Sequence, residues 1–97
     1  MRKYELMAIY PLDEEKSKKG SETLKADLAK FGATIEKEEP FGDRDLTYEV
    51  KKQTRGRFIL SVISVNPEKL QDIDRQFKLN DNLLKYLFVK IDERKAR

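Results

Sequence analysis

The chain has 97 residues, of which 40% are charged and 9% aromatic, and its net charge at pH 7 is +3. This length allows one domain with a single hydrophobic core. The absence of cysteine and histidine excludes disulfides, thiolate nucleophiles, Cys/His zinc sites and imidazole acid–base chemistry.

The sequence also argues against membrane insertion and secretion. No apolar run approaches the roughly 20 residues that a membrane-spanning helix needs. The opening Met1-Arg2-Lys3 leads into a predicted strand instead of the apolar segment of a signal peptide. We therefore expect a soluble protein of the cytoplasm, with no metal or other cofactor. The small positive charge is compatible with phosphate contacts but is not diagnostic of them.

The first part of the chain predicts a strand followed by a helix. Residues 2–10 have the aromatic and β-branched character of a strand and stop at Pro11. Asp13 is a suitable cap for a helix that ends at Gly32. One stripe of this helix is apolar: Leu24, Leu28 and Phe31. Gly20 lies inside the helix and costs about 1 kcal/mol relative to alanine, so we expect the first turns to be loose.

The middle of the chain predicts a hairpin. Residues 33–52 alternate weakly between polar and apolar and are interrupted at Pro40. A long, bent edge strand with a bulge near Pro40 explains this pattern, because proline is tolerated at sheet edges and bulges. Residues 53–56 are the predicted turn, and residues 55–65 return as the partner strand. This partner strand is apolar on both faces and therefore requires cover on both.

The last part predicts a second helix and a fourth strand. Asn66-Pro67-Glu68 combines a cap, a proline at the first helical position and an acid in the first turn. The apolar stripe of this helix is Leu70, Ile73 and Phe77. Residues 80–82 form a turn and residues 83–91 a strand. The last few residues are expected to be disordered.

The order β-α-β-β-α-β predicts an α+β ferredoxin-like sandwich, in which a four-stranded antiparallel sheet carries both helices on one face. We expect a single ferredoxin-like domain over residues 1–97. The helix-covered face of the sheet is expected to hold Leu6, Ala8, Ile59, Ile63, Tyr86 and Phe88.

Two helices cannot cover both faces of this sheet. The other face is left with seven apolar side chains: Met7, Ile9, Phe58, Leu60, Val62, Leu87 and Val89. Burying one such side chain is worth about 1.5–3 kcal/mol, so we expect a partner protein to bind these residues. The alternative is an ordinary sheet with scattered surface apolar groups.

A second candidate surface is basic. Arg2 and Lys3 begin the first strand, and Lys85 and Lys90 lie on the last strand, which is expected to be its neighbour. Together with Tyr4, these four cations predict an RNA-binding surface, because cations contact phosphates and an aromatic ring stacks on a base or forms a hydrogen bond. The alternative is a solvated edge whose lysines prevent strand pairing.

Four motifs relate the chain to a known family. They are R-x-Y-E at residues 2–5, L-x-Y-x-V-K at residues 46–51, Gly56 in the hairpin, and L-N-D-N-L-L-K-Y at residues 79–86. In these motifs, and along almost its entire length, the chain resembles the bacterial small-subunit ribosomal protein S6 family. It departs from the family at Gly20, which interrupts the first helix, and at Glu49, where proline is common.

The resemblance implies a non-catalytic constituent of the small ribosomal subunit. Such proteins bind the central domain of 16S ribosomal RNA cooperatively, as a heterodimer with ribosomal protein S18. By position, Arg2, Tyr4 and Lys85 match motif residues that approach the RNA or the partner. Lys3 and Lys90 are added on their charge and strand position only. No small-molecule substrate and no membrane are expected.

Three other functions are compatible with this fold class, and the sequence argues against two of them. The RNP1 signature of an RNA-recognition motif fails, because Arg57 stands where an aromatic residue is required. An acylphosphatase-like enzyme needs a glycine-rich phosphate loop, and the four glycines lie far apart. A self-associating ligand-binding or regulatory module on the same fold remains the main alternative.

Overall fold

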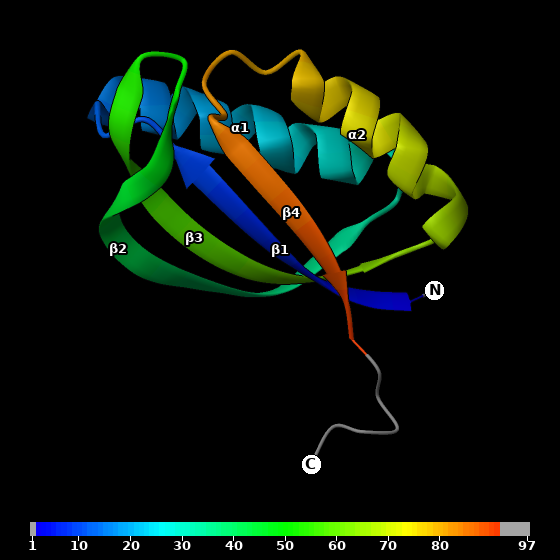
Figure 1. Ribbon diagram of the computed structural model, residues 1–97. Helices are drawn as coiled ribbons and strands as arrows, with labels where there is room; N and C mark the ends of the chain where they lie inside the picture. The colour runs from blue at the N-terminus through cyan, green and yellow to red at the C-terminus, as the bar shows by residue number, and fades with distance from the viewer. Residues whose placement is uncertain (1, 92–97) are drawn as a thin grey trace.

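The computed structural model describes residues 2–91 and contains a four-stranded antiparallel sheet and two helices (Figure 1). The elements are β1 (Arg2–Tyr10), α1 (Glu14–Lys30), β2 (Thr34–Val50), β3 (Gln53–Val65), a 3-10 turn (Pro67–Lys69), α2 (Leu70–Lys78) and β4 (Lys85–Lys90). The strand order is β2-β3-β1-β4, and both helices lie on one face. The predicted ferredoxin-like fold is confirmed. The prediction for the last few residues falls outside the described range.

The helix starts follow from the predicted caps. The Asp13 carboxylate accepts hydrogen bonds from the backbone N–H groups of Glu15 (2.9 Å) and Lys16 (3.2 Å). The Asn66 side chain accepts one from the N–H of Glu68 (3.0 Å) ahead of α2. These bonds satisfy N–H groups that have no partner within a helix. Neither helix in the described range is long and apolar enough to cross a membrane.

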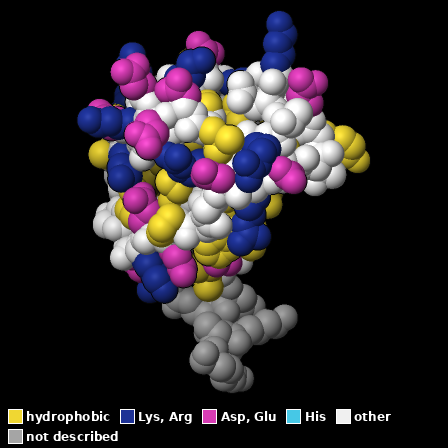
Figure 2. Space-filling view, turned by 90° about the vertical axis from the view of Figure 1, so that its left-hand side faces the viewer, with side chains coloured by type: hydrophobic (Ala, Val, Ile, Leu, Met, Phe, Trp, Pro, Cys, Tyr) yellow, Lys and Arg dark blue, Asp and Glu magenta, His cyan; other side chains and the backbone are white. Residues whose placement is uncertain are grey.

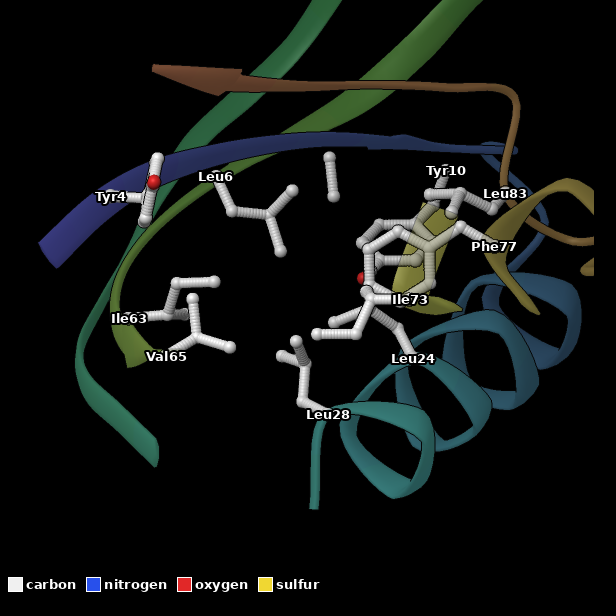
Figure 3. Close-up of a cluster of buried hydrophobic side chains, with 11 residues drawn as sticks. Tyr4, Leu6, Tyr10, Leu24, Leu28, Ile63, Val65, Ile73, Phe77 and Leu83 are labelled. Carbon is white, nitrogen blue, oxygen red and sulfur yellow. The ribbon is translucent and has the colours of Figure 1, made fainter. Parts of the chain in front are cut away.

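The core lies between the sheet and the helices (Figure 3). Side chains of β1 and β3 point toward those of α1 and α2. The largest fully buried residues are Tyr10, Phe77, Leu6, Leu28, Ile63, Ile73 and Val65. The predicted helix stripes and the predicted helix-covered sheet face therefore meet in one cluster, with Ile59, Tyr86 and Phe88 packed at its margin.

Gly20 has a different role from the one expected. It is buried, and a Cβ placed on it would lie 2.3 Å from the Asn82 carbonyl oxygen and 3.0 Å from the Tyr10 ring. The backbone of the α2–β4 turn therefore approaches α1 more closely than any larger residue permits. Gly20 does not mark a loose turn of α1; it is the position where α1 and this turn pack together.

β2 and β3 form a long hairpin, and its turn lies earlier than predicted. β2 is an edge strand with register shifts at 35–37, at 40–42 and at 45–50, as the bent strand near Pro40 predicted. The turn itself is Lys51-Lys52, and both residues have positive φ (49° and 66°). Positive φ at both central residues is the conformation of a two-residue turn that matches strand twist. Residues 53–56 are thus part of β3.

β4 is shorter than predicted. Leu83 and Leu84 precede it and are buried, and the N–H of Leu84 donates to the Ile9 carbonyl (2.7 Å). This bond extends the contact between β1 and the end of the α2–β4 turn. β4 neighbours β1, as expected.

Candidate functional site

The sheet face opposite the helices, called here the open face, holds all seven predicted apolar residues. The β1 register places Met7 between Leu60 and Leu87. Glu5 lies between Val62 and Val89, and Ile9 lies beside Phe58. The seven side chains therefore form one continuous apolar area across the three strands β3, β1 and β4.

The open face is not uniformly uncovered. Leu87 and Val89 on β4 are 58% and 47% exposed, and Met7, Phe58, Leu60 and Val62 are half-buried. Ile9, however, is only 7% exposed. The expectation that nothing in the chain covers this face is wrong at Ile9, because the end of the β2–β3 hairpin contributes cover there.

This covering segment, residues 44–55, is called here the hairpin arm. It extends beyond the end of β1 (Figure 1). Residues of the arm and of the open face together line a pocket of about 350 Å³. Leu46, Tyr48 and Val50 line the pocket from the arm; Met7, Ile9 and Leu87 line it from the sheet. The cavity is open to solvent and mainly apolar, the character of a site that accepts a side chain or small apolar group.

Lys51 ties the tip of the hairpin arm to the α2–β4 turn. Its Nζ donates to the carbonyl oxygens of Asn80 (3.4 Å) and Leu83 (3.3 Å). Two cross-strand ion pairs, Arg55–Asp45 (3.0 Å) and Arg57–Asp43 (3.2 Å), link the two sides of the hairpin. The arm is thus held at its tip and along its length, although exposed ion pairs contribute little individually.

The five predicted RNA-contacting residues do not form one cluster. Arg2, Lys3 and Lys90 lie at the end of the sheet where β1 starts and β4 finishes, because Lys90 pairs with Tyr4. Lys85 pairs with Ile9 and lies at the opposite end, on the rim of the pocket. Lys3 forms an ion pair with Glu36 (3.3 Å).

Tyr4 is part of the core. Its side chain is 8% exposed and lies on the helix-covered face with Leu6 (Figure 3). A ring packed in this way is not free to stack on a base. Its contact with RNA stays a prediction, and the geometry gives it no support.

A hydrogen-bonded aromatic group connects β4 to α2. The Tyr86 hydroxyl donates to the Asp74 carboxylate, and the Tyr86 ring packs edge-on against Phe77 at 5.2 Å between centroids. The hydrogen bond from Tyr86 lowers the pKa of Asp74, and Lys78 lowers it further. Burial and the nearby Asp74 carboxylate raise the pKa of the Tyr86 hydroxyl.

Charge on the hairpin side of the molecule is mixed. Figure 2 shows Lys and Arg side chains interspersed with Asp and Glu, with hydrophobic groups between them. No group of three potential ligands among residues 2–91 is placed to hold a metal ion. The described surface thus has two features that a binding partner could use: the apolar area on the open face, and the cations at the two ends of the sheet.

Sequence reasoning missed the hairpin arm and its pocket. The lengths of the strands indicate such an extension: β2 has 17 residues and β3 has 13, whereas β1 has only 9. A hairpin that much longer than its neighbour extends past the sheet, and sheet twist curls such an extension. The hydrogen bonds of Lys51 could not be predicted from the sequence, because the carbonyl groups that accept them are about 30 residues away in the chain.

Comparison with known proteins gives consistent matches over nearly the full length. A family model described as ribosomal protein S6 matches residues 3–90. The small ribosomal subunit protein bS6 of Treponema denticola is 48% identical over 93 residues, which cover 96% of this chain and 100% of the relative. The protein of that name from Halalkalibacterium halodurans is 36% identical over 95 residues, covering 96% and 100%.

A solved structure agrees with the fold. The crystal structure of 30S ribosomal protein S6 from Thermotoga maritima is similar with a TM-score of 0.81, covering 98% of this chain and 96% of that one. The two sequences are 24% identical, so this likeness concerns the arrangement of the elements.

Proposed function

The chain belongs to the ribosomal protein S6 family of the small ribosomal subunit, and from this premise we propose that it binds the central domain of 16S ribosomal RNA cooperatively with ribosomal protein S18. The proposal includes a heterodimer of the two proteins, formed in the cytoplasm. Family membership itself confirms the resemblance inferred from the sequence.

The protein is a structural constituent of the ribosome and not an enzyme. Its relatives carry the name of a ribosomal protein along their full length. The expectation of a non-catalytic role is therefore confirmed by the family. RNA binding is the role expected of such a protein.

The observation that carries the partner proposal is the open face. Leu87 and Val89 are exposed on β4, next to the half-buried Met7, Leu60 and Val62. A continuous apolar area on three strands is a surface that another protein stabilises by covering it. Each Å² of apolar surface removed from water contributes about 25 cal/mol.

The RNA proposal draws on the basic end of the sheet. Arg2 and Lys90 form no ion pair with another described residue, and Lys3 lies beside them. Cations gathered at one end of a rigid sheet suit a phosphate backbone. Contact with RNA on this end leaves the open face available for the partner, so one sheet holds both molecules in a fixed geometry.

Binding to a central-domain RNA fragment, measured with and without S18, tests the proposal. We expect weak binding by this protein alone and at least about tenfold tighter binding when S18 is present, a change of about 1.4 kcal/mol. A fragment from another domain of the same RNA serves as the control. Equal affinity with and without S18 would contradict cooperativity.

Sedimentation of the pure protein addresses the alternative. A monomer that forms a 1:1 complex when S18 is added agrees with the proposal. A stable dimer formed without S18 or RNA would instead favour a self-associating module whose open faces cover one another.

A further inference from the structure

We propose that the pocket under the hairpin arm receives an aromatic side chain of the partner protein, flanked on the partner by a carboxylate that pairs with Lys85. This inference rests on the proposed function, because it takes the open face as the partner's docking surface. It adds to the proposed function the kind of partner side chain that binds most tightly, called here the anchor, and the place where this side chain binds.

The size and lining of the pocket fit an aromatic anchor. The volume of about 350 Å³ accommodates one large side chain with room for its backbone at the mouth. Met7, Ile9 and Phe58 form an apolar floor, and Tyr48 and Leu87 stand at the sides. Aromatic residues seated in such pockets at the centre of an interface dominate binding energies.

The charged residues that line the pocket favour an acidic residue next to the partner's aromatic side chain. Three charged residues line it: Arg44, Asp45 and Lys85. Asp45 is neutralised by Arg55 at 3.0 Å, whereas Lys85 forms no ion pair with a described residue. The Arg44 guanidinium lies 5.6 Å from the centre of the Phe41 ring and also lacks an acidic partner in the described range. The rim is therefore net positive, which complements a carboxylate.

The pocket is already formed before any partner binds. The hairpin arm is fixed at its tip by the two bonds from Lys51 to the carbonyls of Asn80 and Leu83. A pocket held open in advance avoids the cost of ordering a loop at the moment of association. The partner therefore does not have to order this segment when its anchor binds.

A protein occupant fits better than an RNA base. The open face continues from the pocket to Glu5 on β1 and to Glu39 on β2, which pairs with Leu60. Lys37, opposite Val62, offsets part of this charge, but the surface next to the pocket consists of Met7, Leu60 and Leu87. The phosphates of a strand whose base entered the pocket would therefore lie over apolar side chains and lose part of their hydration. A polypeptide with apolar and mixed polar side chains carries no such penalty.

Titration of S18 into matched variants tests the anchor. Leu87→Asp places a charge at the pocket wall, and Leu79→Asp makes the same change at a position that is 74% exposed and lies at the end of α2. Lys85→Glu reverses the rim charge, and Lys19→Glu makes the same reversal on α1. We expect about tenfold weaker S18 binding for the two pocket variants and changes within about twofold for the two controls.

A direct probe uses the Met7 methyl group. The chain contains only two methionines, so a methyl-labelled sample gives a simple NMR spectrum, and Met7→Leu assigns the signal. We expect N-acetyl-Phe-Glu-amide at millimolar concentration to shift the Met7 signal more than N-acetyl-Phe-Lys-amide does. Lys85→Glu should reverse this preference.

The outcomes separate the inference from the proposed function. If wild-type protein does not bind S18, the proposed partner is wrong, and the peptide titration alone decides the chemistry of the pocket. If S18 binds wild type and both pocket variants equally, the anchor is overturned while the partner stands. A single-stranded RNA oligonucleotide that shifts the Met7 signal more than the Phe-Glu peptide would also overturn it.

Discussion

The side-chain amide of Asn80 donates a hydrogen bond of 3.1 Å to the backbone carbonyl of Gly20, 60 residues earlier in the chain. Asn80 is buried, and its Oδ1 also accepts from the N–H of Asn82 (3.0 Å). One side chain therefore fixes the α2–β4 turn internally and holds it against α1. The same turn receives Lys51 from the hairpin arm, so three separate parts of the chain meet there.

Replacing Gly20 by alanine should destabilise the protein. Alanine is favoured over glycine in a helix by about 1 kcal/mol, but the added Cβ would meet the Asn82 carbonyl oxygen at 2.3 Å. Because that atom belongs to the backbone of a docked turn, we expect a net loss of at least about 2 kcal/mol. Urea denaturation followed by circular dichroism measures the change.

The matched control for this substitution is Thr23→Ala, at an exposed position of the same helix. It should leave stability unchanged or raise it by a few tenths of a kcal/mol. A Gly20→Ala protein more stable than wild type would show that the turn is free to move away from α1.

Removing the Lys51 ammonium should loosen the hairpin arm without unfolding the sheet. Lys51→Met keeps the length of the side chain but cannot donate to the Asn80 and Leu83 carbonyls. Hydrogen–deuterium exchange of residues 44–55 should become faster while exchange in β1 stays unchanged. S18 affinity should fall as well, because the pocket wall is no longer fixed.

Lys52→Met is the control for that measurement. Lys52 is the adjacent turn residue, also exposed and also at positive φ, and the substitution removes the same charge. It should leave exchange in the arm unchanged. Equal acceleration by both variants would assign the effect to the turn conformation instead of the Lys51 contacts.

The Tyr86–Asp74 hydrogen bond should make part of the stability depend on pH. The bond lowers the pKa of Asp74 in the folded state, so its contribution is complete above the ordinary carboxyl pKa of about 4 and is lost as pH falls through the lowered value. The pKa of Tyr86 is raised in the folded state, so that contribution is complete below the ordinary tyrosine pKa of about 10 and is lost as pH rises above it.

Comparing wild type with Tyr86→Phe tests this dependence. The Asp74 side chain is 40% exposed, so we expect a difference in unfolding free energy of only about 1 kcal/mol near neutral pH. The difference should shrink below about pH 4 and above about pH 10. A difference that stays constant from pH 3 to pH 8 would assign the effect of the substitution to packing alone.

Side-chain alternation was enough to predict the two faces of the sheet. In β1, Leu6 and Met7 point to opposite faces, and the structure assigns every predicted core and open-face residue of the strands to its expected side. Tyr4 received two predictions: its position in the alternation places it with Leu6 on the helix-covered face, where the structure has it, whereas its basic neighbours predict contact with RNA, which stays a prediction. Parity is the stronger signal because a strand has only two faces.

Contacts between distant segments were not predictable in the same way. The sequence predicts loose first turns of α1 at Gly20, because nothing near this glycine in the chain indicates that the Asn82 backbone packs against it. The Lys51-Lys52 turn lacks the glycine or asparagine that usually marks positive φ. The cover over Ile9 depends on the curl of the hairpin arm, a consequence of sheet twist that acts over the whole length of two strands.

The basic end of the sheet should determine the salt dependence of RNA binding. Arg2 and Lys90 lie at this end, and neither forms an ion pair with another described residue. If both contact phosphates, the Arg2→Gln/Lys90→Gln double variant should bind central-domain RNA more weakly in the presence of S18. The slope of log K against log salt concentration should also become shallower by about 1 for each cation removed. The matched control is Lys18→Gln/Lys19→Gln, which removes two exposed cations from α1 and should alter only the long-range attraction. An identical slope for the two double variants would place the RNA elsewhere on the surface, because only cations that neutralise phosphates release counterions on binding.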